Sequence, residues 1–206
     1  RRRGGLERAQ FAQPVTGHLT LYTSQPDRDA ARTAEAFRRA QPGVQVEIFR
    51  SGTTEVMNKL QAEFAAGAPR ADVLLIADAV SMEKLKADHR LQPEPGLDLS
   101  HIPPGAYDRD HTYFGSKLIT TGIVYNTAAG MKPTSWADLL KPAAKGQVAL
   151  PSPLYSGAAA IHMAALQAAL GPAYYKDLAA NGAIAMKGNG GIIAAVASGQ
   201  AMYGFV

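Results

Sequence analysis

Short apolar runs alternate with helical patterns in the first half of the chain, and this order restricts the fold more than any other feature. Three runs have the composition of strands, and each is followed by a segment with helical spacing; the six segments are 18–23, 27–40, 44–49, 55–66, 72–76 and 80–87. A repeated strand–helix order predicts an α/β layer with a parallel sheet. The run at 72–76 is almost entirely apolar, which is typical of a central strand.

A second feature is the stretch 147–160, QVALPSPLYSGAAA. It predicts a buried strand that ends at Pro151, a polar loop, and an Ala-rich helix over 158–170. Ser156 suits the N-cap of this helix, because its hydroxyl can accept a hydrogen bond from a free amide of the first turn. The alternative is that Ser156 caps its helix and does nothing else.

The loop from Arg50 to Thr54 repeats this arrangement earlier in the chain. Thr53 or Thr54 can cap the helix at 55–66, and Gly52 lets a ligand approach the backbone closely. Free amides and the positive end of the dipole make a helix N-terminus an anion site. We therefore expect two helix N-termini to hold one small anion between two lobes.

Ligands of open α/β sheets bind at the carboxyl ends of the strands, and most candidate residues follow a predicted strand. Asp78 could receive an amine or a sugar hydroxyl, or could cap the next helix. Alternation along the segment before Asn126 sends one of Thr120 and Thr121 toward the ligand. The predicted ligand-binding residues are Ser24, Gln25, Ser51, Gly52, Thr53, Asp78, Thr121, Ser152, Tyr155, Ser156, Gly157 and Asn189.

Composition excludes several classes of protein. The chain is 47% hydrophobic and 18% charged, so it is globular. Its net charge is +4, with three positive charges at Arg1 to Arg3, so nucleic-acid binding is not expected. It has no cysteine, and its five histidines show no metal-ligand spacing, so we predict no metal site and no cofactor. No apolar run is long enough to span a bilayer.

The ordered motifs LTLYTSQPD, IFRSGTTEV, ADVLLIADA, TGIVYNT, KPTSWADLL, ALPSPLYSGAAA and GNGGIIAAVASGQAMYGF resemble periplasmic solute-binding proteins of ABC importers. Among these the chain is most similar to the ferric-iron-binding-like branch of the type II fold. The resemblance implies an α/β fold with two lobes joined by crossing hinge strands, at 117–125 and from Ala201 onward. It also implies a periplasmic monomer that delivers a ligand to the membrane subunits of an ABC importer.

The domains expected from this resemblance are a leader over 1–17, a first lobe over 18–116, and a hinge strand with a second lobe over 117–206. Members of the family usually continue with a segment that returns to the first lobe. We therefore expect a chain truncated at its C-terminus, with an incomplete first lobe. The leader shows no signal-peptide apolar region, so the signal of an exported protein would precede this sequence.

The ligand class rests on where the sequence departs from the iron-binding pattern. Those members use a histidine shortly after the first strand and two adjacent tyrosines near the second crossing. Here Pro26 follows Ser24 and Gln25, and Tyr203 has no tyrosine beside it. Hydroxyls and backbone amides suit a phosphonate, a sugar phosphate or a similar anion. Ferric iron remains the alternative within the family.

The sequence gives less support to two other classes of function, a hydrolase and a regulatory domain. A hydrolase would need a positioned base near Ser51 or Ser156, and neither serine lies in a G-x-S-x-G motif. An effector-binding regulatory domain would need a helix-turn-helix, for which the leader is too short. We therefore predict no enzymatic activity and no catalytic residue.

Overall fold

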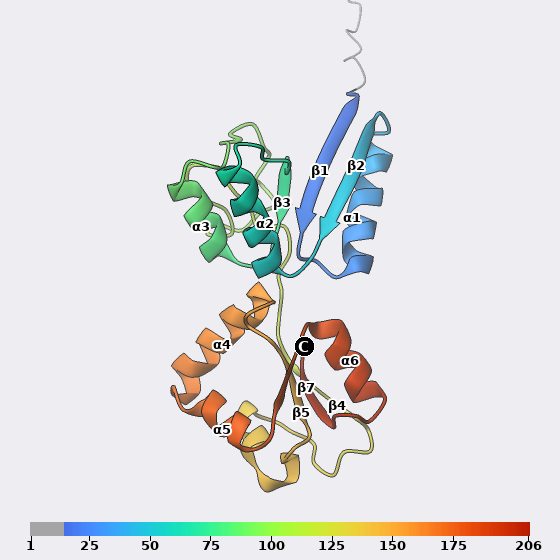
Figure 1. The fold of residues 1–206 in the computed structure, drawn as a ribbon, viewed down its shortest axis with the longest axis vertical. Helices are drawn as coiled ribbons and strands as arrows, with labels where there is room; N and C mark the ends of the chain where they lie inside the picture. The colour runs from blue at the N-terminus through green and yellow to red at the C-terminus, as the bar shows by residue number, and fades with distance from the viewer. Residues whose placement is uncertain (1–14) are drawn as a thin grey trace, which may run out of the picture.

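The structure is a computed structural model that describes residues 15–206, and it contains two separate sheets. Figure 1 shows the two sheets one above the other, each with helices on its sides. We call the elements around the upper sheet the first lobe and those around the lower sheet the second lobe. Most of the predicted leader, residues 1–14, lies outside the described residues, and Gly17 already belongs to the first strand.

The first lobe has a parallel sheet with strand order β2-β1-β3. Helix α1 covers one side of this sheet, and α2 and α3 cover the other (Figure 1). Its elements are β1 (Gly17–Thr23), α1 (Asp27–Ala40), β2 (Val44–Arg50), α2 (Thr53–Ala65), β3 (Val73–Leu75) and α3 (Ala79–Ala87). The predicted strand–helix order is therefore confirmed.

One prediction about this sheet is wrong. Within residues 15–206, strand β3 lies at the edge beside β1, and its Val73 is 42% exposed. The central strand is β1, where Tyr22 is buried and donates a hydrogen bond to Glu63 in α2 at 2.5 Å. A continuous apolar run shows that a strand has two apolar faces, but it does not show how many neighbours pair with its edges.

The second lobe has a sheet with strand order β4-β7-β5-β6, in which β4 is antiparallel to β7. Figure 1 shows α4 and α5 on one side of this sheet and α6 on the other. Its elements are β4 (Ile123–Tyr125), the 3₁₀ helices η1 (Trp136–Leu140) and η2 (Pro142–Ala144), β5 (Val148–Pro151), α4 (Gly157–Leu170), α5 (Tyr174–Ala180), β6 (Ile184–Met186), α6 (Asn189–Ala197) and β7 (Tyr203–Phe205).

The core of the second lobe forms on both sides of β7. Tyr203 and Phe205 are buried against α4, α5 and η1, and Ile192 of α6 is buried on the opposite face. Gly204 lies between them, and a Cβ there would lie 2.5 Å from Ile192 Cγ2. A glycine at this position therefore lets α6 pack directly on the sheet.

The connection between the lobes differs from the predicted hinge strand. Only Ile123–Tyr125 forms a strand, and 117–122 is irregular. At its end, Gly122 exchanges two backbone hydrogen bonds with Val206, at 2.8 and 3.0 Å. The remaining residues of the segment have no neighbouring strand among the described residues, so their β-branched side chains alone do not make a strand. No helix within residues 15–206 is long and apolar enough to cross a membrane.

Candidate functional site

A cavity of about 1030 Å³ lies between the two lobes. It opens at the carboxyl ends of β1, β2 and β3 on one side, and of β5 and β6 on the other, as expected for open α/β sheets. Eight of the twelve predicted residues line it: Ser24, Gln25, Gly52, Thr53, Asp78, Tyr155, Ser156 and Asn189. The sequence analysis therefore identifies residues from both lobes that the fold brings to one cavity.

The other four predicted residues do not line the cavity. Ser51 donates its hydroxyl to the Glu55 carboxylate, and Ser152 Oγ accepts a hydrogen bond from the amide of Leu154 at 3.3 Å. Thr121 lies in the irregular connection, where its neighbour Thr120 lines the cavity instead. The fourth residue, Gly157, is buried in the contact between the lobes.

The predicted caps of the helices differ in their outcome. Ser156 caps α4 by accepting from the amide of Ala159 at 3.3 Å, as predicted. Asp78 caps α3, because its carboxylate accepts from the amide of Ser81 at 2.6 Å and from the Ser81 hydroxyl at 2.9 Å. Its other predicted role, as a ligand contact, stays a prediction.

The predicted cap of α2 is wrong. Gly52 is the N-cap residue, α2 begins at Thr53, and no side chain caps it. Thr53 is only 3% exposed, and its Oγ1 has no hydrogen-bond partner within residues 15–206. Ser24 Oγ at the end of β1 is also buried without a partner there. A buried hydroxyl without a hydrogen-bond partner destabilises the folded protein by about 1–3 kcal/mol. Ser24 and Thr53 both line the cavity.

The N-termini of α2 and α4 touch each other, which changes the predicted geometry. A Cβ on Gly157 at the start of α4 would lie 2.9 Å from Thr53 Oγ1 and 3.0 Å from Asp78 Oδ2. No ligand atom fits between two groups in such close contact. The N-terminus of α6 also faces the cavity, and residues 187–191 form part of the wall there.

Tyr155 of the second lobe packs directly on the first lobe. Its ring and carbonyl oxygen lie against Gly52, where a Cβ would be 2.4 Å from the Tyr155 oxygen. Its hydroxyl lies 3.5 Å from an Nη of Arg50, and Lys187 Nζ lies 5.0 Å from the centre of its ring. Tyr155 therefore links a cation on each lobe.

The sequence analysis did not choose Arg50, although it lines the cavity. Its Nε donates to the carbonyl oxygen of Gln25 at 2.8 Å and lies 3.5 Å from the exposed Asp27 carboxylate. These contacts hold the guanidinium at the strand ends. Arg50 is the last residue of β2 and directly precedes the polar loop. This position in the sequence could have identified it as a residue of the cavity.

Lys187 also brings positive charge to the cavity, but it has a competing partner. Its Nζ lies 3.4 Å from Glu55 Oε1 on the first lobe. The hydrogen bond from Ser51, together with the charge of Lys187, lowers the pKa of Glu55, so this carboxylate is ionised at neutral pH. The pair is exposed, and a surface ion pair of this kind contributes little to stability.

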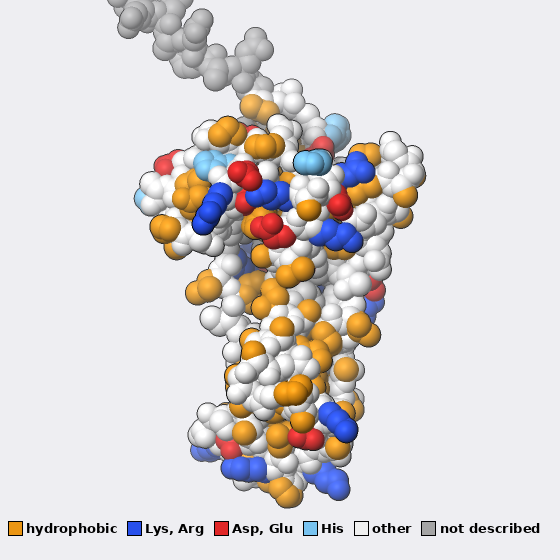
Figure 2. Space-filling model, turned by 90° about the vertical axis from the view of Figure 1, so that its left-hand side faces the viewer, with side chains coloured by type: hydrophobic (Ala, Val, Ile, Leu, Met, Phe, Trp, Pro, Cys, Tyr) orange, Lys and Arg blue, Asp and Glu red, His pale blue; other side chains and the backbone are white. Residues whose placement is uncertain are grey.

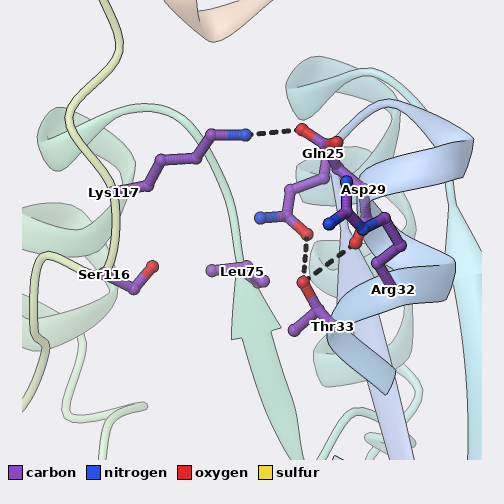
Figure 3. A pocket seen from close by; sticks show the side chains of 7 residues that line it. All are labelled: Gln25, Asp29, Arg32, Thr33, Leu75, Ser116 and Lys117. Carbon is purple, nitrogen blue, oxygen red and sulfur yellow. Dashed lines mark hydrogen bonds and ion pairs between the residues drawn. The ribbon is translucent and has the colours of Figure 1, made fainter. Parts of the chain in front are cut away.

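A smaller recess of about 370 Å³ adjoins the cavity and shares four lining residues with it: Gln25, Leu75, Ser116 and Lys117. Figure 3 shows Lys117 reaching across the recess to Asp29 of α1, and the Gln25 amide facing Thr33. The Lys117 Nζ to Asp29 Oδ2 distance is 2.5 Å, and this hydrogen bond lowers the pKa of Asp29. Lys117 therefore links the connecting segment to α1 of the first lobe.

Solved structures of periplasmic binding proteins are similar to this chain. AfuA from Actinobacillus pleuropneumoniae, with fructose-6-phosphate bound, has a TM-score of 0.77 and 23% identity; the match covers 93% of this chain and 63% of AfuA. Iron-bound HitA from Pseudomonas aeruginosa has a TM-score of 0.76 and 23% identity, over 92% of this chain and 62% of HitA. A periplasmic thiamin-binding protein has a TM-score of 0.71 and 17% identity, over 92% of this chain and 61% of its own.

These matches confirm the predicted fold, the two-lobed type II periplasmic-binding architecture. At such identities they show the fold and not the ligand. The chain spans 63%, 62% and 61% of the lengths of these three proteins. No curated protein sequence matches it.

The sequence itself matches a protein family along most of its length. The matched region is residues 23–206, which begins at the last residue of β1 and includes every element that lines the cavity. The chain belongs to the family described as bacterial extracellular solute-binding protein.

Proposed function

We propose that this protein captures a small anionic ligand between its two lobes and delivers it to the membrane subunits of an ABC importer, outside the cytoplasm. The ligand is a phosphonate, a sugar phosphate or a similar oxyanion. Membership of the solute-binding family supports the transport role. The chemistry of the cavity supports the ligand class.

The observation that carries this proposal is the pair of buried hydroxyls, Ser24 Oγ and Thr53 Oγ1, which have no partner within residues 15–206. Both residues line the cavity, and so does Arg50. An oxyanion accepts hydrogen bonds from hydroxyls and from a guanidinium, and such charge-assisted bonds are short and strong. A bound oxyanion would therefore satisfy groups that otherwise stay unpaired.

The start of α6 offers backbone donors to the same ligand. The amides of Asn189 and Gly190 make no hydrogen bond among residues 15–206, as expected for the first turn of a helix. Lys187 precedes them, and all three residues line the cavity. Free amides at the positive end of a helix dipole favour an anion.

Ferric iron is a less suitable ligand for this cavity. A hard ferric ion prefers several anionic oxygen ligands. Within residues 15–206 no cluster of three His, Cys, Asp or Glu side chains could hold a metal ion. Asp78 already accepts two hydrogen bonds from Ser81. No observation favours a hydrolase or a regulatory module, and we assign no catalytic residue.

Isothermal titration with inorganic phosphate, methylphosphonate, glucose 6-phosphate and ferric citrate tests the proposal. We expect at least one phosphorus oxyanion to bind and Arg50→Gln to weaken that binding about 10- to 100-fold, since a hydrogen bond to a charged group contributes about 1.5–3 kcal/mol. Arg39→Gln is the control, because Arg39 is exposed and pairs with Glu35 on α1. Binding of ferric citrate alone, or equal effects of both substitutions, would contradict the proposal.

A further inference from the structure

One part of the wall that the first lobe contributes to the cavity is apolar, and we call this part the apolar wall. Leu75 at the end of β3, Met82 of α3 and Phe114 in the following loop all line it. The connecting segment adds Leu118 and Ile119, which are 89% and 51% exposed. Exposed large hydrophobic side chains that gather at a cavity are a common mark of a ligand-binding surface.

Two carboxylates near this wall already have partners. Asp78 accepts from Ser81, and Glu83 accepts a short hydrogen bond from the hydroxyl of Tyr113, which lines the cavity. That hydrogen bond raises the pKa of Tyr113 to about 12, so its hydroxyl stays protonated and stays with Glu83. The hydroxyl groups of a sugar placed along this wall would therefore compete with Ser81 and Tyr113 for these two carboxylates, and hydroxyls left unpaired on burial oppose binding.

The donors for an anion lie on other parts of the wall. They come from Arg50 and Thr53 at the end of β2 and the start of α2, and from 187–190 of the second lobe. The cavity of about 1030 Å³ is much larger than a phosphate group. It has room for an anionic head at these donors and for an uncharged body along the apolar wall.

We infer that the ligand has a compact phosphate or phosphonate head and an apolar, ring-sized body, and is not a polyhydroxylated sugar phosphate. This inference rests on the proposed function, because it needs an oxyanion at the donors of the cavity. It adds the chemical nature of the rest of the ligand. Contact between apolar surfaces would bind the body, at a strength that grows with the area removed from water.

Titration with four probes separates the two proposals: phenylphosphonate, inorganic phosphate, glucose 6-phosphate and benzyl alcohol. We expect phenylphosphonate to bind at least tenfold more tightly than inorganic phosphate or glucose 6-phosphate, and benzyl alcohol to bind weakest. Glucose 6-phosphate binding as tightly as phenylphosphonate would overturn the inference and leave the proposed function standing. Absence of binding by all three anions would overturn both.

A matched pair of variants tests the apolar wall directly. Ile119→Asn places an amide on the wall, and Ile184→Asn makes the same change on β6, outside the cavity, at a residue that is 49% exposed. We expect Ile119→Asn to weaken phenylphosphonate about five- to tenfold and to leave inorganic phosphate unchanged. The control should alter neither. Equal weakening of both anions by Ile119→Asn, or no change in either, would overturn the inference.

Discussion

Substitution of Gly52 by alanine should hold the two lobes apart without damage to either. In the structure a Cβ at this position would lie 2.4 Å from the carbonyl oxygen of Tyr155 and 2.6 Å from two carbons of its ring. Ordinary contacts between heavy atoms need about 3.5 Å, so Tyr155 would have to retreat by roughly 1 Å. Gly52 has φ −64° and ψ 157°, which alanine adopts without strain, so the first lobe should fold normally.

The effect of Gly52→Ala on closure depends on which arrangement of the lobes carries the steric overlap with Tyr155. Overpacking of a tight contact costs about 1–3 kcal/mol. Here the contact joins two lobes that an irregular segment connects, so separation of the lobes relieves it. If the whole cost falls on the closed arrangement, the ratio of closed to open protein falls about 5- to 150-fold. The apparent affinity for the ligand falls by up to the same factor.

Fluorescence energy transfer can measure this change, because the chain has no cysteine of its own. Lys84→Cys on α3 and Ala168→Cys on α4 place one dye on each lobe, at exposed positions. Gly130→Ala is the control, because a Cβ there would have no atom within 4 Å. We expect lower transfer and weaker anion binding for Gly52→Ala than for the control. Wild-type transfer and affinity in Gly52→Ala would show that the contact at Tyr155 does not limit closure.

Three further predictions follow from single side chains. Thr53→Val removes an unpartnered hydroxyl, so the free energy of unfolding should rise by about 1 kcal/mol and anion binding should weaken. A lower free energy of unfolding in chemical denaturation would refute this prediction. Gly157→Ala should raise the free energy of unfolding, since alanine is the better helix former in α4. It should weaken anion binding, since its Cβ would lie 2.9 Å from Thr53 Oγ1. A fall in both the free energy of unfolding and the affinity would contradict the argument. Burial lowers the pKa of His162 below its usual 6.5, so the unfolded state binds the proton more readily. The free energy of unfolding should therefore fall as the pH drops below about 6.5, and His162→Gln should flatten this dependence in denaturation at several pH values.

The elements that sequence reasoning identified best are those set by local forces. The bounds predicted for α1 are those of the structure, and Ser156 caps α4 as predicted, because helix propensity and N-capping depend on residues close in sequence. The strand ends near the cavity were also predictable, since the strand–helix order places them at one edge of each sheet.

Strand pairing and contacts between residues far apart in the sequence were harder to predict. Strand β3 was expected at the centre of its sheet and lies at the edge, because an apolar run does not report how many strands pair with it. The predicted ligand contact with the N-termini of α2 and α4 likewise joins residues that are far apart in sequence, and it stays a prediction. Gly157 and Thr53 lie in different lobes, and only the tertiary arrangement shows that they touch. Arg50 was passed over because its contacts with Gln25 and Tyr155 are long-range.

Charge is also distributed in a way that composition does not reveal. Figure 2 shows Lys, Arg, Asp and Glu side chains gathered over the first lobe and at the far end of the second, with mostly hydrophobic and uncharged side chains between them. Helix α4 belongs to this region and has no charged residue in its 14 positions.

The contact that joins the lobes also explains how a ligand could favour closure. Packing of Gly157 and Tyr155 on the first lobe helps to bury Thr53, whose Oγ1 then makes no hydrogen bond within the described chain. Closure without a ligand therefore carries a cost of about 1–3 kcal/mol for this one group. When the lobes are apart, water can bind the hydroxyl and the cost disappears. If the proposed ligand reaches the Thr53 hydroxyl from the cavity, it would remove this cost only in the closed arrangement, and its binding would shift the population toward closure by that difference.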